Sequence, residues 1–65
     1  MKKDYNAQVQ ELAKVTEKFV DLKAKSIEDK VNIIEHLMQE AESHGERMVI
    51  DACLIILNKM LKGGQ

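Results

Sequence analysis

The stretch VIDACLIILNKML, residues 49–61, decides the fold of this chain. On a helical projection its polar residues Asp51 and Asn58 share a narrow strip with Lys62, which follows shortly after. The apolar residues fill one arc that is wider than half of the circumference: Val49, Ile50, Ala52, Cys53, Leu54, Ile56, Leu57, Met60 and Leu61. Because one neighbouring surface cannot cover so wide an arc, we expect this helix to contact its own chain and a second chain.

A β-strand is the alternative for residues 49–57, because isoleucine and valine are frequent there. A single strand needs a sheet to join, and no other segment of the chain alternates as a strand does. The helix is therefore the preferred interpretation.

Two further helices are predicted upstream. Residues 4–24 place Tyr5, Val9, Leu12, Thr16 and Phe19 at helical spacings of four and three. This stripe is widened on both sides by Ala13, Val15, Val20 and Leu22. Residues 26–43 repeat the pattern with Ile27, Val31, Ile34, Met38 and Ala41, widened by Ile33 and Leu37.

The boundaries of these helices follow from capping residues. Ser26 is a typical N-cap, and Asp29 stands where a capping box places an acid. Gly45 could end the second helix in a left-handed conformation, or Ser43 and Glu46 could form a capping box for the third helix. A single helix that continues through Gly45 is a third possibility, at a cost of about 1 kcal/mol. The third helix should span residues 45–62, followed by a short tail at residues 63–65.

The length of 65 residues limits the chain to one domain, residues 1–65, with a small core. Its single cysteine, Cys53, cannot form an intrachain disulfide. Domains of this size are commonly stabilised by a disulfide, a metal or a second subunit. We therefore predict an all-α, three-helix protein that forms a homodimeric bundle through its third helix. The predicted interface is Val49, Ile50, Cys53, Leu54, Ile56, Leu57, Met60 and Leu61.

Charge is unevenly distributed along the chain. Residues 1–25 carry six lysines against four acids, whereas residues 26–44 carry one lysine against five acids. Glu28, Glu35 and Glu42 recur every seven residues and define an acidic ridge on the second helix. The ridge is either a solvated helix face or a docking surface for a basic patch on a partner.

Catalytic and metal-binding patterns are weak. His36, Glu40 and His44 lie four residues apart, but the two histidines diverge by about 80° on an ideal helix, and zinc would need further ligands. Cys53 lies within the apolar arc, where burial lowers thiol reactivity. We therefore expect no enzyme activity, no metal and no cofactor.

The preferred functional interpretation is a small regulator, inhibitor or adaptor that binds another protein stoichiometrically as a homodimer. The main alternative is a DNA-binding transcriptional regulator that uses Lys3, Lys14, Lys18 and Lys25, although a single arginine and interrupting acids make nucleic acid an unfavoured partner. A further alternative is a non-catalytic accessory subunit of an enzyme or assembly. The lone cysteine and the polar start of the chain favour the cytoplasm, and the longest apolar run falls far short of the ~20 residues that span a bilayer, so no membrane association is expected.

Overall fold

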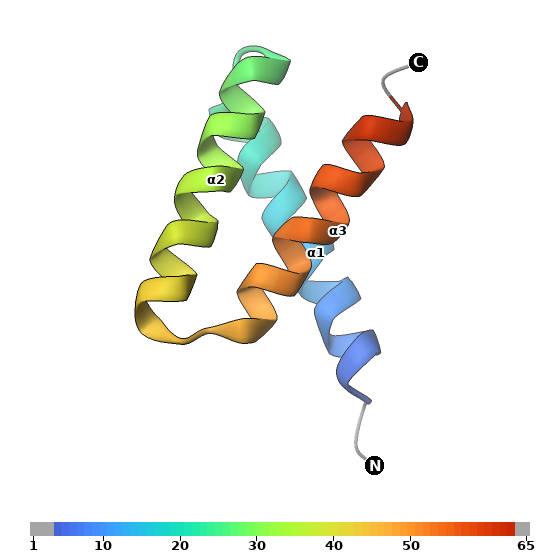
Figure 1. The fold of residues 1–65 in the computed structure, drawn as a ribbon. Helices are drawn as coiled ribbons and strands as arrows, with labels where there is room; N and C mark the ends of the chain where they lie inside the picture. The colour runs from blue at the N-terminus through green and yellow to red at the C-terminus, as the bar shows by residue number, and fades with distance from the viewer. Residues whose placement is uncertain (1–3, 64–65) are drawn as a thin grey trace.

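The computed structural model of the protein describes residues 4–63. Its three α-helices are α1 (Tyr5–Lys23), α2 (Ile27–His44) and α3 (Arg47–Gly63). Figure 1 shows α3 crossing α1, with α2 to one side and joined to α3 by a tight turn. The predicted all-α, three-helix fold is confirmed, and the strand alternative for residues 49–57 is wrong.

The N-termini of α1 and α2 are capped by side chains. The carboxylate of Asp4 accepts a hydrogen bond from the backbone N–H of Ala7 at 2.8 Å. The hydroxyl of Ser26 accepts one from the N–H of Asp29 at 3.2 Å, as the sequence predicted. The Asp29 carboxylate reaches back to the N–H of Lys25 at 3.1 Å, one residue before the position that a standard capping box uses.

Gly45 ends α2 in the left-handed conformation, with φ of 71°. The N–H of Glu46 donates to the carbonyl of Ala41 at 2.8 Å, and the N–H of Gly45 donates to the carbonyl of Glu42 at 3.3 Å. These bonds form a Schellman-type C-cap that satisfies the last carbonyls of the helix. The continuous helix and the Ser43 cap are therefore both wrong, because the chain turns at Gly45 and Ser43 lies in the last turn of α2.

The C-terminal boundary of α3 differs slightly from the prediction. The helix includes Gly63, one residue beyond the predicted end, and Gly63 does not adopt a positive φ that would stop it earlier. Frayed helix ends commonly shift by a residue or two. Gly64 and Gln65 of the predicted tail lie outside the described residues.

The core lies where α3 meets the other two helices. Within residues 4–63 the buried side chains are Val9, Ala13, Val20, Ile34, Ala41, Ala52, Cys53 and Ile56. Half of them are alanine or cysteine, and small side chains let helix axes approach closely. Both α1 and α2 make extensive contacts with α3 and few with each other.

The buried face of α1 is rotated from the predicted one. Ala13 and Val20, predicted only to widen the stripe, are 5% and 1% exposed, whereas Tyr5 and Phe19 are 46% and 45% exposed. The reason is that α3 packs against the side of α1 that carries Ala13, where no large side chain holds the helices apart. The predicted face of α2 is largely confirmed by the burial of Ile34 and Ala41, although Ile27 is exposed at the first turn.

Replacing the α2 cap should destabilise the fold. Ser26→Ala removes the acceptor of the Asp29 N–H and should lower the free energy of unfolding by about 1 kcal/mol. Ser43→Ala, an exposed change in the last turn of the same helix, is the control and should leave stability unchanged or slightly raised. Chemical denaturation followed by circular dichroism measures both, and equal stabilities would contradict the capping role of Ser26.

The left-handed position of Gly45 gives a second stability prediction. No atom lies within 4 Å of the position of an added Cβ, so Gly45→Ala creates backbone strain without a steric clash. An L-residue in this conformation costs about 1 kcal/mol, and we expect a loss of stability of that size. Asparagine tolerates the conformation better, so Gly45→Asn should recover part of the loss. If alanine were as stable as glycine in thermal unfolding, the turn would have another geometry.

Candidate protein-interaction surface

One side of α3 carries an apolar stripe that the chain itself covers only in part. Ile50, Leu54, Leu57 and Leu61 recur at spacings of four, three and four, which places them along one side of the helix. We call these four residues the outer stripe. Leu54 is 49% and Leu61 is 78% exposed, while Ile50 and Leu57 are half-buried. The stripe extends along about 16 Å of helix.

The structure divides the eight predicted interface residues into two groups. Four of them form the outer stripe, and one of these four, Leu57, also packs against the core. Cys53 and Ile56 lie in the core with 0% and 2% exposure, and Val49 and Met60 are half-buried against it. The wide apolar arc of α3 is thus explained by two neighbours on one side, α1 and α2, and by an open surface on the other.

The acidic ridge of α2 borders the outer stripe. Glu35 and Glu42 line a shallow groove between α2 and α3, of about 430 Å³, together with Met38, Gln39 and Leu57. Glu28 is exposed but does not line this groove. Two of the three ridge residues therefore lie beside the apolar stripe, an arrangement that only the packing of α2 against α3 determines.

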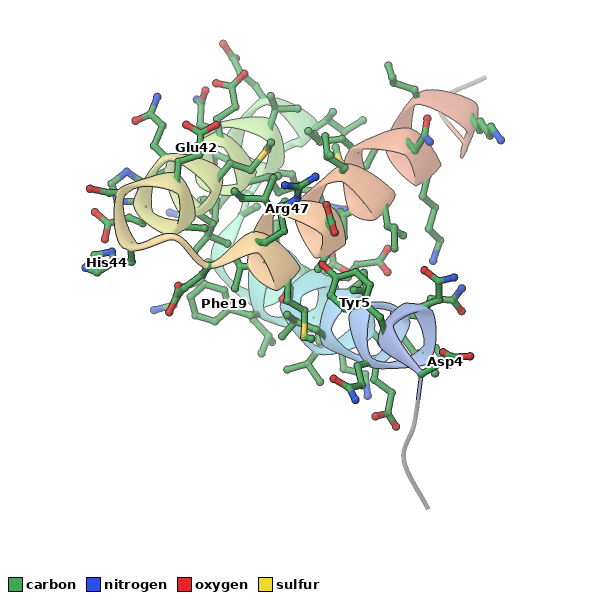
Figure 2. The ribbon with its side chains drawn as sticks, turned by 60° about the horizontal axis from the view of Figure 1, so that its bottom comes forward. Asp4, Tyr5, Phe19, Glu42, His44 and Arg47 are labelled. Carbon is green, nitrogen blue, oxygen red and sulfur yellow. The ribbon has the colours of Figure 1, made fainter. Side chains whose placement is uncertain are left out.

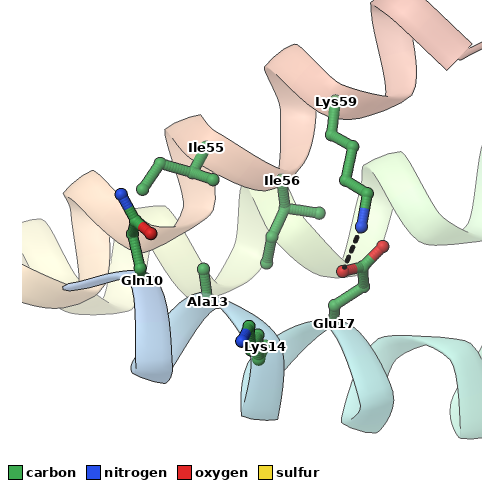
Figure 3. Close-up of a pocket in the computed structure, with 7 residues that line it drawn as sticks. All are labelled: Gln10, Ala13, Lys14, Glu17, Ile55, Ile56 and Lys59. Atoms are coloured by element: carbon green, nitrogen blue, oxygen red, sulfur yellow. Dashed lines mark hydrogen bonds and ion pairs between the residues drawn. The ribbon is translucent and has the colours of Figure 1, made fainter. Parts of the chain in front are cut away.

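On its opposite side, α3 makes polar contacts with α1. The Nζ atom of Lys59 lies 3.2 Å from the Oε1 atom of Glu17. Figure 3 shows this pair at one end of a depression between α1 and α3, with Ile56 beside it; the depression has a volume of about 250 Å³. Because the Lys59 side chain is largely exposed, this ion pair contributes little to stability.

The N-terminal turn of α1 is attached to the first turns of α3. Figure 2 shows Tyr5 reaching from α1 toward α3, and its hydroxyl donates a hydrogen bond of 2.5 Å to the Oδ2 atom of Asp51. This bond favours the protonated phenol and raises the pKa of Tyr5 above its ordinary value. Asp51 also lies 3.7 Å from the Nε atom of Arg47, one turn earlier on α3.

The pKa values of Cys53 and His44 are both raised by their surroundings. Burial raises the pKa of the Cys53 thiol, which lowers its thiolate fraction at neutral pH. The Nδ1–H of His44 donates to the carbonyl of Glu40 at 2.9 Å, and this bond raises the pKa of the imidazole. The described residues contain no group of three potential metal ligands. None of the three helices is long and apolar enough to cross a membrane.

Sequence reasoning missed a second exposed apolar surface. Leu12, Val15, Phe19 and Leu22 are spaced by three, four and three residues along α1, and Val15 and Leu22 are 65% and 86% exposed. Their spacing was visible in the sequence. The position of α3 against α1, which turns this side away from the core, was not.

The described residues thus offer two apolar surfaces, each beside charged side chains, as the features best suited to bind a partner. Such surfaces on a small domain are characteristic of protein–protein contacts. Comparison of the chain with known protein families, curated proteins and solved structures yields no match.

Proposed function

We propose that this protein is a small stoichiometric regulator, inhibitor or adaptor that binds another protein and is itself a homodimer joined through the outer stripe of α3. The observation that carries the proposal is the exposure of Leu54 and Leu61 in a stripe that continues through Ile50 and Leu57. When a partner covers an apolar surface of this kind, water leaves it. The favourable free energy of this burial is roughly proportional to the apolar area removed from water.

A second copy is the simplest occupant of the outer stripe. Two identical stripes related by a two-fold axis make a self-complementary contact, which is the commonest arrangement in soluble oligomers. The spacing of four and three residues is also the one that allows side chains of paired helices to interdigitate. A dimer would further offset the small size of the core, which contains only eight buried side chains within residues 4–63.

The acidic ridge is the part of this proposal that concerns the second protein. Glu35 and Glu42 border the dimer contact and remain at its edge, where a basic patch on a partner would meet them. Complementary charge at the edge of an interface speeds association and rejects partners of the wrong sign. The ridge therefore sets which proteins bind, and the apolar stripe joins the two copies.

Charge placed on the outer stripe should separate the two copies without unfolding them. Leu54→Glu with Leu61→Glu alters two exposed side chains, so the folded chain buries no new charge, whereas the dimer would bury four. Sedimentation at micromolar concentration should give a dimer for the wild type and a monomer for this variant. Val15→Glu with Leu22→Glu, equally exposed on α1, is the control and should remain dimeric. A wild type that sediments as a monomer contradicts the proposal.

Neutralising the ridge should affect binding of the partner more than folding. Glu35→Gln with Glu42→Gln should preserve the helical circular dichroism and slow the association rate with a partner isolated from native extract. The dependence of that rate on salt should become weaker. Glu28→Gln, the control, lies outside the groove and should leave the rate nearly unchanged, while losing a few tenths of a kcal/mol of stability from the first turn of α2. An association rate that none of these changes alters would identify the ridge as a solvated face.

A further inference from the structure

A second groove lies between α1 and α2, away from the outer stripe of α3. It has a volume of about 400 Å³ and is lined by Phe19, Lys23, Asn32, Ile33, His36 and Leu37. Its surface is almost wholly apolar. The exposed side chains of Val15 and Leu22 lie on the same side of α1 as Phe19, because they are four residues before it and three residues after it.

The groove exists because α1 and α2 hardly contact each other. Each of them packs against α3, which separates their axes on the side that α3 does not occupy. Phe19, Ile33 and Leu37 therefore lack a neighbour on that side, and Phe19 keeps 45% exposure. A fourth helix laid between α1 and α2 would cover them, as α3 does from its own side.

Charge around the groove identifies the kind of helix that fits. Two of the three acids of α1 pair with lysines of the other helices: Oδ1 of Asp21 lies 2.9 Å from Nζ of Lys30 on α2, and Oε1 of Glu17 lies 3.2 Å from Nζ of Lys59 on α3. The third acid, Glu11, lines the surface next to the groove. Two lysines of α1 remain exposed beside the apolar side chains. Lys23 lies over the Phe19 ring at 5.8 Å from its centroid, and Lys18 lines the adjoining surface with Val15.

The groove itself contains no carboxylate among its described lining residues, and Lys23 and His36 are its ionisable groups. The apolar floor and the lysines at its edge are therefore complementary to an amphipathic helix whose apolar stripe is flanked by acids.

We infer that the α1–α2 groove binds an amphipathic, acid-flanked helix of a partner protein. The inference rests on the proposed function in one respect, that the protein acts by binding another protein, and it assigns the partner's helix to a face separate from the dimer contact. The apolar residues of that helix would occupy the floor formed by Phe19, Ile33 and Leu37, and its acids would pair with Lys18 and Lys23.

Charge disfavours a second copy that pairs through its own α1 as the occupant. If two copies paired through α1 about a two-fold axis that passes near Phe19, Lys18 and Lys23 of one copy would lie near the same lysines of the other. Like charges brought together at an interface oppose association. The same lysines attract a helix that carries glutamates beside its apolar stripe.

A pair of synthetic peptides tests the inference. Each is a helix of about 18 residues with leucines at spacings of three and four, flanked by glutamates in one peptide and by lysines in the other. Fluorescence anisotropy with the full chain should show saturable binding of the glutamate peptide and at least tenfold weaker binding of the lysine peptide. Lys18→Glu with Lys23→Glu should reverse this preference, which a general loss of structure could not do.

Two matched variants locate the binding site. Val15→Gln with Leu22→Gln should weaken binding of the glutamate peptide about tenfold, because two apolar contacts are lost. Leu54→Gln with Leu61→Gln changes the other apolar face and should alter the affinity less than twofold. The opposite ranking would place the peptide on α3 and overturn the inference, while leaving the proposed protein-binding function intact.

The remaining outcomes separate the two proposals. Absence of saturable binding of the glutamate peptide overturns the groove inference, whatever the oligomeric state. A monomeric wild type that still binds the peptide contradicts the dimer and supports the groove. A mixed-sequence DNA duplex is the third probe: if it displaces the peptide and the Lys18→Glu/Lys23→Glu variant no longer binds it, the lysines recognise nucleic acid and the inference is overturned.

Discussion

The packing of α3 against both α1 and α2 is the contact on which the rest of the structure depends. Ala52, Cys53 and Ile56 are fully or almost fully buried, and they meet Val9, Ala13 and Val20 from α1 and Ile34 from α2 in one cluster. Because α1 and α2 contact each other little, removal of α3 would leave neither of them with a covered apolar face. The small side chains at this contact let the helices approach closely. Because the helices are close, the space between them holds few large side chains.

A core of this kind has a direct consequence for the surface. Eight large hydrophobic side chains are exposed within residues 4–63, which equals the number of buried core residues. A chain of 65 residues has too little volume to enclose all of its apolar groups. The exposed groups are not scattered evenly: Leu54 and Leu61 belong to one helical stripe, and Val15, Phe19 and Leu22 belong to another. Single exposed apolar side chains are common on protein surfaces, whereas grouped ones are typical of binding surfaces.

Different charged side chains lie beside these two surfaces, because ion pairs between the helices engage some of the acids. Asp21 and Glu17 of α1 pair with lysines of α2 and α3, which leaves exposed lysines beside the α1 stripe. Glu35 and Glu42 of α2 instead lie beside the α3 stripe. Glu35 and Glu42 therefore border the α3 stripe, whereas Lys18 and Lys23 border the α1 stripe.

Much of the architecture was determined by the sequence alone. The periodicity of three apolar stripes, the Ser26 cap and the glycine at position 45 predicted three helices with boundaries correct to one or two residues, because these signals act over a few neighbouring residues. The helical spacing of Ile50, Leu54, Leu57 and Leu61 was present in the sequence, but nothing in the sequence marked these four residues as a surface separate from the core.

Only the tertiary structure decided which apolar residues are covered. The sequence could not separate Cys53 and Ile56 from Leu54 and Leu61, since all four lie within one wide arc, and it placed Phe19 in the core in preference to Val20. The rotation of each helix about its axis depends on how closely its neighbours approach, and that distance depends on small residues such as Ala13 and Ala52 meeting across the interface. Burial is therefore a property of pairs of helices, and no single helical pattern contains it.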